Sequence, residues 1–307
     1  YEIDTMKTAP KPRQPDSIDI GPLVVAQLTP PGGKPLSSPY QVINWKDIPN
    51  AAKDPSGLWY GNYGGKLAIV YNTSLAAVPT KAKDFTNPAF KGVVGITGDP
   101  TSSNQAFMSL LAASIGNGGE QNLSDVTKGL ALFKEVKTAA PLVKVNGTNL
   151  ATGTAKVGFM WDFNALGVIP AAKAAGLDLK FAYPTDFVLQ APPYINAINA
   201  KSPNCANARL WQEFVYSQNK GKMAADLTAA DLKLSGSKLF ALLQGGQNHF
   251  QQSGADPIMS KAMTTKKVLV PSLLDFKVPS TAKVVGPATI SDVLAAREQV
   301  ISSWASL

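Results

Sequence analysis

Gly92-Val-Val-Gly-Ile-Thr-Gly98, followed at once by Asp99-Pro-Thr-Ser-Ser-Asn-Gln-Ala106, is the stretch that decides the fold. The first part is apolar, β-branched and short enough for a buried strand. The second part places a proline and three hydroxyl residues where a sharp turn would lead into a capped helix. The predicted helix carries Phe107, Leu110, Leu111 and Ile115 on one face and ends at the glycine-rich residues 116–119.

The start of this helix is a candidate anion site. Backbone N–H groups and the positive end of the helix dipole point outward there, and Thr101, Ser102 and Ser103 add hydroxyl groups. A phosphate, phosphonate or carboxylate group suits such a turn. The same residues are also common helix caps, and a cap without a ligand is the simpler interpretation of this stretch alone.

The amino-acid composition limits the classes of protein to which the chain can belong. The chain has 307 residues, of which 45% are hydrophobic and 16% charged, which is enough for two compact lobes and too apolar for disorder. No run approaches the ~18 apolar residues of a membrane helix. The single cysteine, Cys205, excludes a disulfide framework, and the single histidine, His249, excludes a multi-histidine metal site. No cofactor or metal is expected.

The net charge of +8 does not indicate nucleic-acid binding. The lysines are scattered along the chain, and no basic run is interleaved with aromatic residues. A nucleic-acid interface requires a clustered basic footprint, so we expect no such partner.

Outward from the central stretch, strands are predicted at 17–20, 66–71, 142–145, 157–161 and 179–184, and residues 194–199 follow a pair of prolines. Helices are predicted between and after them, one capped by Ser124, one capped by Asn204 and a last one over 291–304. Strands that alternate with helices are typical of an α/β architecture with mostly parallel sheets.

Ligands of parallel α/β sheets bind beyond the carboxyl ends of the strands. The ends of four predicted strands are polar or aromatic, and they lie at Gly21-Pro22, Tyr71-Asn72, Asp99 to Ser103 and Trp161 to Asn164. Each is an ordinary turn when taken alone, and their joint occurrence predicts one binding cleft.

The order of these segments resembles the extracellular (periplasmic) solute-binding proteins of ABC importers, in the group with polyamine-, thiamine-, ferric- and phosphonate-binding members. The resemblance covers about residues 16–305 and is carried by the segments 65–72, 84–93, 99–103, 158–162 and 197–211. The last segment, followed by Gln212-Glu-Phe-Val-Tyr-Ser217, is the most specific.

The resemblance implies a two-lobed, type II-like α/β fold, in which each lobe is a mixed sheet flanked by helices and a cleft between the lobes closes on the ligand. We expect lobe 1 to hold residues 1–74 and 193–250, and lobe 2 to hold residues 75–192 and 251–307. Family members usually begin with a β-α-β stretch for which this chain has no room. We therefore expect either a fragment or a remodelled first lobe.

The resemblance also narrows the solute. As aligned, polyamine-binding members carry acids where this chain has Pro100, Ser103 and Tyr194, and ferric-binding members carry a tyrosine pair where it has Trp161-Asp162. The helix start at 101–104 is similar to the anion-holding turn of the ferric and phosphonate members. We expect a transporter component that captures a small polar solute with a phosphonate, phosphate or carboxylate group. Binding of a polyamine- or thiamine-type cation is the alternative.

The expected ligand-binding residues are Gly21, Pro22, Tyr63, Asn72, Asp99, Thr101, Ser102, Ser103, Asn104, Trp161, Asp162, Asn164 and Tyr194. Trp161 would stack on or cover the ligand, with a core position as the alternative. Asp99 and Asp162 would serve as the carboxylate pair of a secreted hydrolase, but no nucleophile–base set accompanies them, so no enzyme is expected. The resemblance implies an exported protein, with its signal peptide removed, that meets a membrane permease; we expect a monomer.

Overall fold

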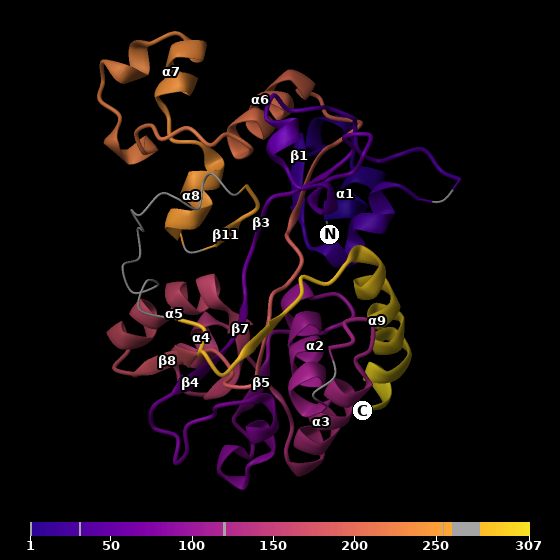
Figure 1. Cartoon of the computed structure of the whole chain (residues 1–307), viewed down its shortest axis with the longest axis vertical. Helices are drawn as coiled ribbons and strands as arrows, with labels where there is room; N and C mark the ends of the chain where they lie inside the picture. The colour runs from indigo at the N-terminus through magenta and orange to yellow at the C-terminus, as the bar shows by residue number, and fades with distance from the viewer. Residues whose placement is uncertain (1, 31, 119–120, 254, 260–276) are drawn as a thin grey trace. The chain divides into compact units, whose positions relative to one another are not determined.

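The computed structural model describes residues 2–30, 32–118, 121–253, 255–259 and 277–307. The chain forms two compact units, each with its own sheet and helices (Figure 1). Unit 1 consists of Tyr1–Gly64 and Pro193–Val270, and unit 2 consists of Gly65–Pro192 and Pro271–Leu307. Each unit therefore combines two separate parts of the chain. The lobe limits expected from the sequence stay a prediction.

Unit 2 is built on a five-stranded sheet in the order β6-β5-β7-β4-β8. Its strands are β4 (Leu67–Asn72), β5 (Val94–Ile96), β6 (Val143–Lys144), β7 (Val157–Trp161) and β8 (Leu179–Ala182). β4, β5 and β7 are buried throughout, as apolar strands inside a covered sheet are. β5 runs parallel to β6 and β7, whereas β4 runs antiparallel to β7 and β8. The mostly parallel sheet predicted from the alternation is wrong, and the mixed sheet implied by the resemblance is confirmed.

Helices flank this sheet in Figure 1, with α2 (Asn104–Gly118), α3 (Thr127–Ala139) and α9 (Ile290–Ser303) packed together. The helices α4 (Gly147–Ala151) and α5 (Asp162–Ala174) pack against each other, and α5 also contacts β4, β7 and β8. The parallel strands β9 (Phe187–Leu189) and β12 (Lys283–Val285) also belong to unit 2.

Two details of the unit 2 helices differ from the sequence predictions. Residues 106–115 of α2 are all buried, so this helix is covered all round rather than on one face. The cap predicted at Ser124 is wrong, because the Asp125 carboxylate accepts the N–H of Thr127, at 2.8 Å, where α3 begins. The carboxylate is the stronger acceptor for the first N–H groups of a helix.

Unit 1 contains the antiparallel sheet β1-β10-β2, made of β1 (Ser17–Ile20), β10 (Ile195–Ile198) and β2 (Tyr60–Gly61). Along β1 the buried residues alternate with more exposed ones, as expected for a strand with one covered face. A second antiparallel pair joins β3 (Tyr63–Gly64) to β11 (Asp256–Pro257).

The α-helices among the described residues of unit 1 are α1 (Glu2–Thr8), α6 (Cys205–Val215), α7 (Gly236–Leu242) and α8 (Gly246–Ser253). α6 packs against β10 and α8. Asn204 precedes α6 as predicted, but it does not cap the helix, because its side-chain amide donates instead to the Asp16 carboxylate at 3.2 Å.

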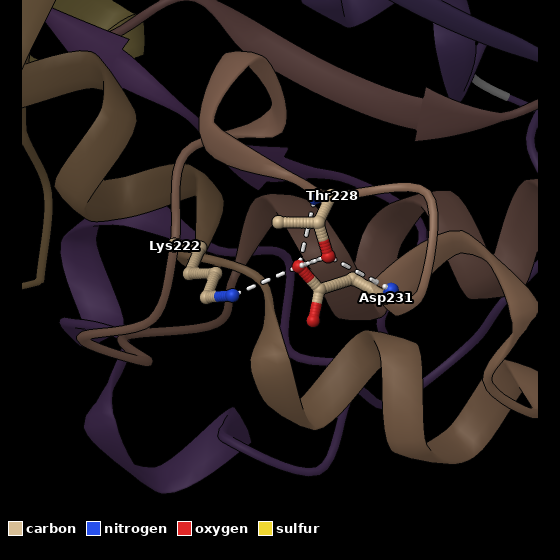
Figure 2. A network of polar contacts seen from close by, with 3 residues as sticks. All are labelled: Lys222, Thr228 and Asp231. Carbon is tan, nitrogen blue, oxygen red and sulfur yellow. Dashed lines mark hydrogen bonds and ion pairs between the residues drawn. The ribbon is translucent and has the colours of Figure 1, made fainter.

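A charged network, shown in Figure 2, holds the segment between α6 and α7. The Asp231 Oδ2 atom lies 2.8 Å from Lys222 Nζ and accepts hydrogen bonds from the N–H and hydroxyl groups of Thr228, both at 2.8 Å. These bonds, the one from Lys222 above all, lower the pKa of the Asp231 carboxyl to about 2. The network fixes the first turn of a short helix at Asp231–Lys233.

Candidate functional site

The carboxyl ends of β5 and β7 meet at one edge of the unit 2 sheet because the two strands are parallel. The predicted site residues that follow β5 and those that follow β7 are therefore brought together. Gln105, in the first turn of α2, connects them: its Oε1 atom accepts the N–H of Trp161 at 3.1 Å and the Nδ2 amide of Asn164 at 3.0 Å. Gln105 was absent from the sequence prediction, although its place in the turn after the central strand was a usable signal.

Asn72 lies at the other end of the same sheet. β4 is antiparallel to β7, so that Leu67 pairs with Trp161 while Asn72 pairs with Leu179 of β8. The Asn72 side chain is 2% exposed, and its Oδ1 atom accepts the N–H of Ser74 at 2.8 Å. The convergence expected from parallel strands does not hold for Asn72, and a ligand contact by this residue stays a prediction.

The turn before α2 makes most of its hydrogen bonds within itself. Asp99 Oδ1 accepts the N–H and the hydroxyl of Thr101, both at 2.8 Å. The Asp99 carbonyl oxygen accepts the N–H groups of Ser102 and Ser103 at 3.1 and 2.7 Å. Ser103 Oγ accepts the N–H of Ala106 at 3.3 Å, which confirms the predicted hydroxyl cap at Ser103.

The next residue, Asn104, holds polar atoms without partners. Both Asn104 Oδ1 and Nδ2 are buried and form no hydrogen bond within the described residues, and the same holds for Thr97 Oγ1 at the end of β5. Among those residues, the backbone N–H groups of Asn104 and Gln105 also lack acceptors. The end of β5 lies beside this turn, since a Cβ atom at Gly98 would be at an ordinary contact distance, 3.5 Å, from Ser103 Cβ. Several hydrogen-bonding groups that have no partner among the described residues therefore lie at the start of α2.

Trp161 and Asp162 have the surroundings of core positions. The Trp161 side chain is 1% exposed and stacks on Phe163, with ring centroids 5.9 Å apart. The Asp162 carboxylate is 3% exposed and accepts hydrogen bonds from the Tyr183 hydroxyl at 2.9 Å and from the N–H groups of Phe163 and Lys66 at 2.9 and 3.2 Å. Its bonds join the start of α5 to the residue before β4 and to the residue after β8. Ligand contacts by Trp161 and Asp162 stay predictions.

The predicted residues of unit 1 also lie together. The Tyr63 and Tyr194 rings stack with centroids 5.2 Å apart and planes 10° apart, and the Tyr194 N–H donates to the Tyr63 carbonyl at 2.8 Å. Gly21 and Pro22 follow β1, which ends beside the start of β10, the strand that Tyr194 precedes. The roles of these four residues stay predictions.

Asp19 of β1 joins this group and was not predicted. Its Oδ2 atom accepts a hydrogen bond from the Tyr63 hydroxyl at 3.2 Å, and the Asn62 side chain also hydrogen-bonds to it. The residue is exposed as a whole, but the protein around the carboxylate excludes much of the solvent, and this burial raises the Asp19 pKa to about 6. The signal in the sequence was an aspartate between Ile18 and Ile20 in a predicted strand.

Two further features bear on the class of site. In the described part of the chain, no group of three or more His, Cys, Asp or Glu residues has an arrangement that would hold a metal ion. None of the described helices has the length and apolar character needed to cross a bilayer.

Comparison with known proteins places these residues in context. The sequence model of a family described as bacterial extracellular solute-binding protein matches residues 33–236. No curated protein matches the chain. Among solved structures, the periplasmic binding protein AfuA from Actinobacillus pleuropneumoniae, with exogenous fructose-6-phosphate bound, has a TM-score of 0.64 and 18% identity, over 99% of this chain and 85% of that one.

Ferric-binding proteins are similar to the same extent. The apo ferric ion-binding protein A of Pasteurella haemolytica has a TM-score of 0.63 and 15% identity, over 98% of this chain and 84% of that one. The ferric binding protein of Campylobacter jejuni has a TM-score of 0.63 and 16% identity, over 99% of this chain and 87% of that one. At these identities the likeness shows the fold alone, and the expected two-lobed α/β fold is confirmed.

Proposed function

Because the chain belongs to the bacterial extracellular solute-binding protein family, we propose that it captures a small solute with a phosphate, phosphonate or carboxylate group. Family membership makes it the solute-binding component of an ABC importer, which implies export, a small-molecule ligand and delivery to a membrane permease. The anionic group on the solute, a periplasmic or cell-surface location, a monomeric state and the absence of nucleic-acid binding all belong to the proposal.

The observation that carries the proposal is the set of unpaired groups at the start of α2. The backbone N–H groups of Asn104 and Gln105 lack acceptors among the described residues, and the buried Asn104 amide and Thr97 hydroxyl lack partners there too. A helix of 15 residues adds a partial positive charge at this end. An anionic oxygen would satisfy these donors in one place. The sugar phosphate bound by AfuA shows that a similar fold accepts such a group.

The hydrogen bonds of Asp99 place the proposed anion site nearer to Asn104 and Thr97 than to Thr101. Its carboxylate already accepts both donors of Thr101, and its carbonyl accepts the next two N–H groups. A second anion close to Asp99 would also be repelled by its charge. The proposal therefore depends on Asn104 and Thr97 more than on Thr101, Ser102 and Ser103.

The test is calorimetric titration of the full chain with inorganic phosphate, methylphosphonate and acetate. Asn104→Leu removes both polar atoms and should weaken binding of the preferred anion by about 1.5–3 kcal/mol, or roughly ten- to hundredfold. The same substitution should raise the melting temperature of the ligand-free protein, because it removes buried polar atoms that are unpaired in the described structure. Asn104→Asp should abolish binding, since it adds a like charge.

Asn117→Leu, near the far end of α2, is the matched control and should leave anion affinity unchanged. Wild-type protein that binds none of the three anions would contradict the proposal. So would Asn104→Asp protein that binds an anion as tightly as the wild type does.

We also propose that the chain has no catalytic activity. The Asp162 carboxylate, one half of the pair that a hydrolase would use, is 3% exposed and accepts three hydrogen bonds from the protein. A buried carboxylate held in this way is poorly placed to act on a substrate. Turnover of chromogenic esters, phosphates or glycosides that is lost in Asp162→Asn would contradict this.

A further inference from the structure

We propose that Asn122 is an acceptor for asparagine-linked glycosylation, in which an oligosaccharide is transferred to its Nδ2 atom. Asn122 lies in the segment between α2 and α3, whereas the proposed anion site lies at the start of α2. The 15 residues of α2, with a length of about 22 Å, separate the two positions. The inference therefore goes beyond the proposed function, and each can fail without the other.

The acceptor motif for this modification is Asn-x-Ser/Thr, with any residue except proline in the middle. It occurs three times in the chain, at residues 72–74, 122–124 and 146–148. Family membership implies that the chain is exported, which is the setting in which the motif is used. The motif alone does not distinguish the three asparagines, but their surroundings in the folded chain do.

Asn122 has the side-chain geometry of an acceptor. The residue is exposed, and its Nδ2 atom forms no hydrogen bond with any described residue. Its Oδ1 atom accepts the backbone N–H of Ser124 at 3.0 Å and the Ser124 hydroxyl at 2.7 Å. The amide and the hydroxyl of the motif are therefore already in contact, while the nitrogen that would carry the sugar is available.

The backbone that follows the motif is held by the rest of unit 2. Gln299 of α9 donates from Nε2 to the Ser124 carbonyl at 2.9 Å and accepts the Val126 N–H at Oε1 at 3.0 Å. The Ser114 hydroxyl of α2 donates to the Asp125 carbonyl at 3.0 Å. None of these bonds uses the Asn122 amide, so a sugar can be attached there without breaking them.

The other two motifs are less accessible in the folded chain. Asn72, the last residue of β4, is 2% exposed, so a transferase could reach it only if the sheet opened. Asn146 is partly buried and accepts the N–H of Asn149 at 2.7 Å at the start of α4. In the described structure, no hydrogen bond joins the Thr148 hydroxyl to Asn146. Modification of the folded chain should therefore be confined to Asn122.

The transfer step exchanges one bond for another. Asn122 Nδ2 loses a proton and bonds to C1 of the first sugar of a polyprenyl diphosphate-linked oligosaccharide. The bond between C1 and the diphosphate oxygen breaks, the lipid diphosphate leaves with the bonding electrons, and the proton passes to a base of the transferase. No group is oxidised or reduced. The two hydrogen bonds that Ser124 donates stabilise negative charge on Asn122 Oδ1, which favours loss of the Nδ2 proton.

The test incubates the folded full chain with a purified single-subunit oligosaccharyltransferase and a polyprenyl diphosphate that carries a short oligosaccharide. Intact-mass spectrometry should show the addition of a single oligosaccharide, and peptide mapping should place it on Asn122. Asn122→Gln protein should gain none. Asn146→Gln is the matched control and should be modified to the same extent as the wild type.

Substitutions at Ser124 test the hydroxyl separately from the asparagine. Ser124→Ala removes the hydroxyl but keeps the carbonyl that bonds to Gln299, so the protein should fold and should not be modified. Ser124→Thr restores a hydroxyl and should restore the modification. Melting curves followed by circular dichroism check that each variant is folded before the reaction.

Absence of transfer to the folded chain, in a reaction that modifies an unrelated acceptor peptide, would overturn the inference. Transfer that persists in Asn122→Gln, or that maps to Asn72 or Asn146, would overturn it as well. Asn122→Gln should leave phosphate binding intact, and Asn104→Asp protein should still be modified at Asn122, so the two proposals are judged separately.

Discussion

Gly129 of α3 is a position at which a single added methyl group should lower stability measurably. A Cβ atom at Gly129 would lie 2.1 Å from the carbonyl oxygen of Leu110 in α2 and 3.0 Å from the backbone nitrogen of Ser114. Both obstacles are backbone, so no side chain can rotate away, and the helices would have to separate by about 1 Å to restore normal contact distances. Overpacking of this kind costs about 3 kcal/mol at its upper end, and the better helix propensity of alanine returns about 1 kcal/mol. Gly129→Ala should therefore lower the free energy of unfolding by about 2 kcal/mol.

Gly167 of α5 provides a matched control, because a Cβ atom there would meet nothing within 4 Å. Gly167→Ala should raise the free energy of unfolding by up to about 1 kcal/mol through helix propensity alone. Urea unfolding of both variants, followed by circular dichroism, should separate them by about 3 kcal/mol. If Gly129→Ala is as stable as Gly167→Ala, the contact between α2 and α3 is not as close as this geometry requires.

The lowered pKa of Asp231 means that its contribution to stability is present above its unfolded pKa of ~3.9 and is lost as the pH falls through the folded value. Carbon NMR should give a titration midpoint of about 2 for the Asp231 carboxyl of the wild type. In Lys222→Met the midpoint should lie closer to ~3.9. Equal midpoints in the two proteins would show that the ion pair does not form. Tyr183→Phe removes one donor to the buried Asp162 carboxylate and should cost about 1.5 kcal/mol in urea unfolding; an unchanged midpoint would mean that this bond is dispensable. Because Trp161 is 1% exposed, Trp161→Leu should lower stability by about 2–4 kcal/mol and raise the fraction of the remaining fluorescence that iodide quenches. A fall in that fraction would place Trp161 at the surface.

Local patterns in the sequence were sufficient to find most elements. The apolar runs at 66–71 and 157–161 became β4 and β7, and the hydroxyl residues after β5 led to α2, with Ser103 as its cap. These features depend on neighbours within a few residues, namely the period of burial and the first N–H groups of a helix. The order of such segments was also enough to identify the solute-binding family.

Tertiary structure alone decided which residues meet. The direction of β4 relative to β7 separated Asn72 from the residues after β5 and β7, although all of them follow strands. Gln105 is hydrogen-bonded to Trp161, which is 56 positions away in the sequence, and Tyr63 is hydrogen-bonded to Asp19, which is 44 positions away. Hydrophobic periodicity indicates which side of a strand is buried. It does not indicate which strand is the neighbour or in which direction that neighbour runs. The unpaired atoms of Asn104 and Asn62 likewise follow from what surrounds them in space, because any asparagine has the same hydrogen-bonding groups and only its neighbours decide whether they are satisfied.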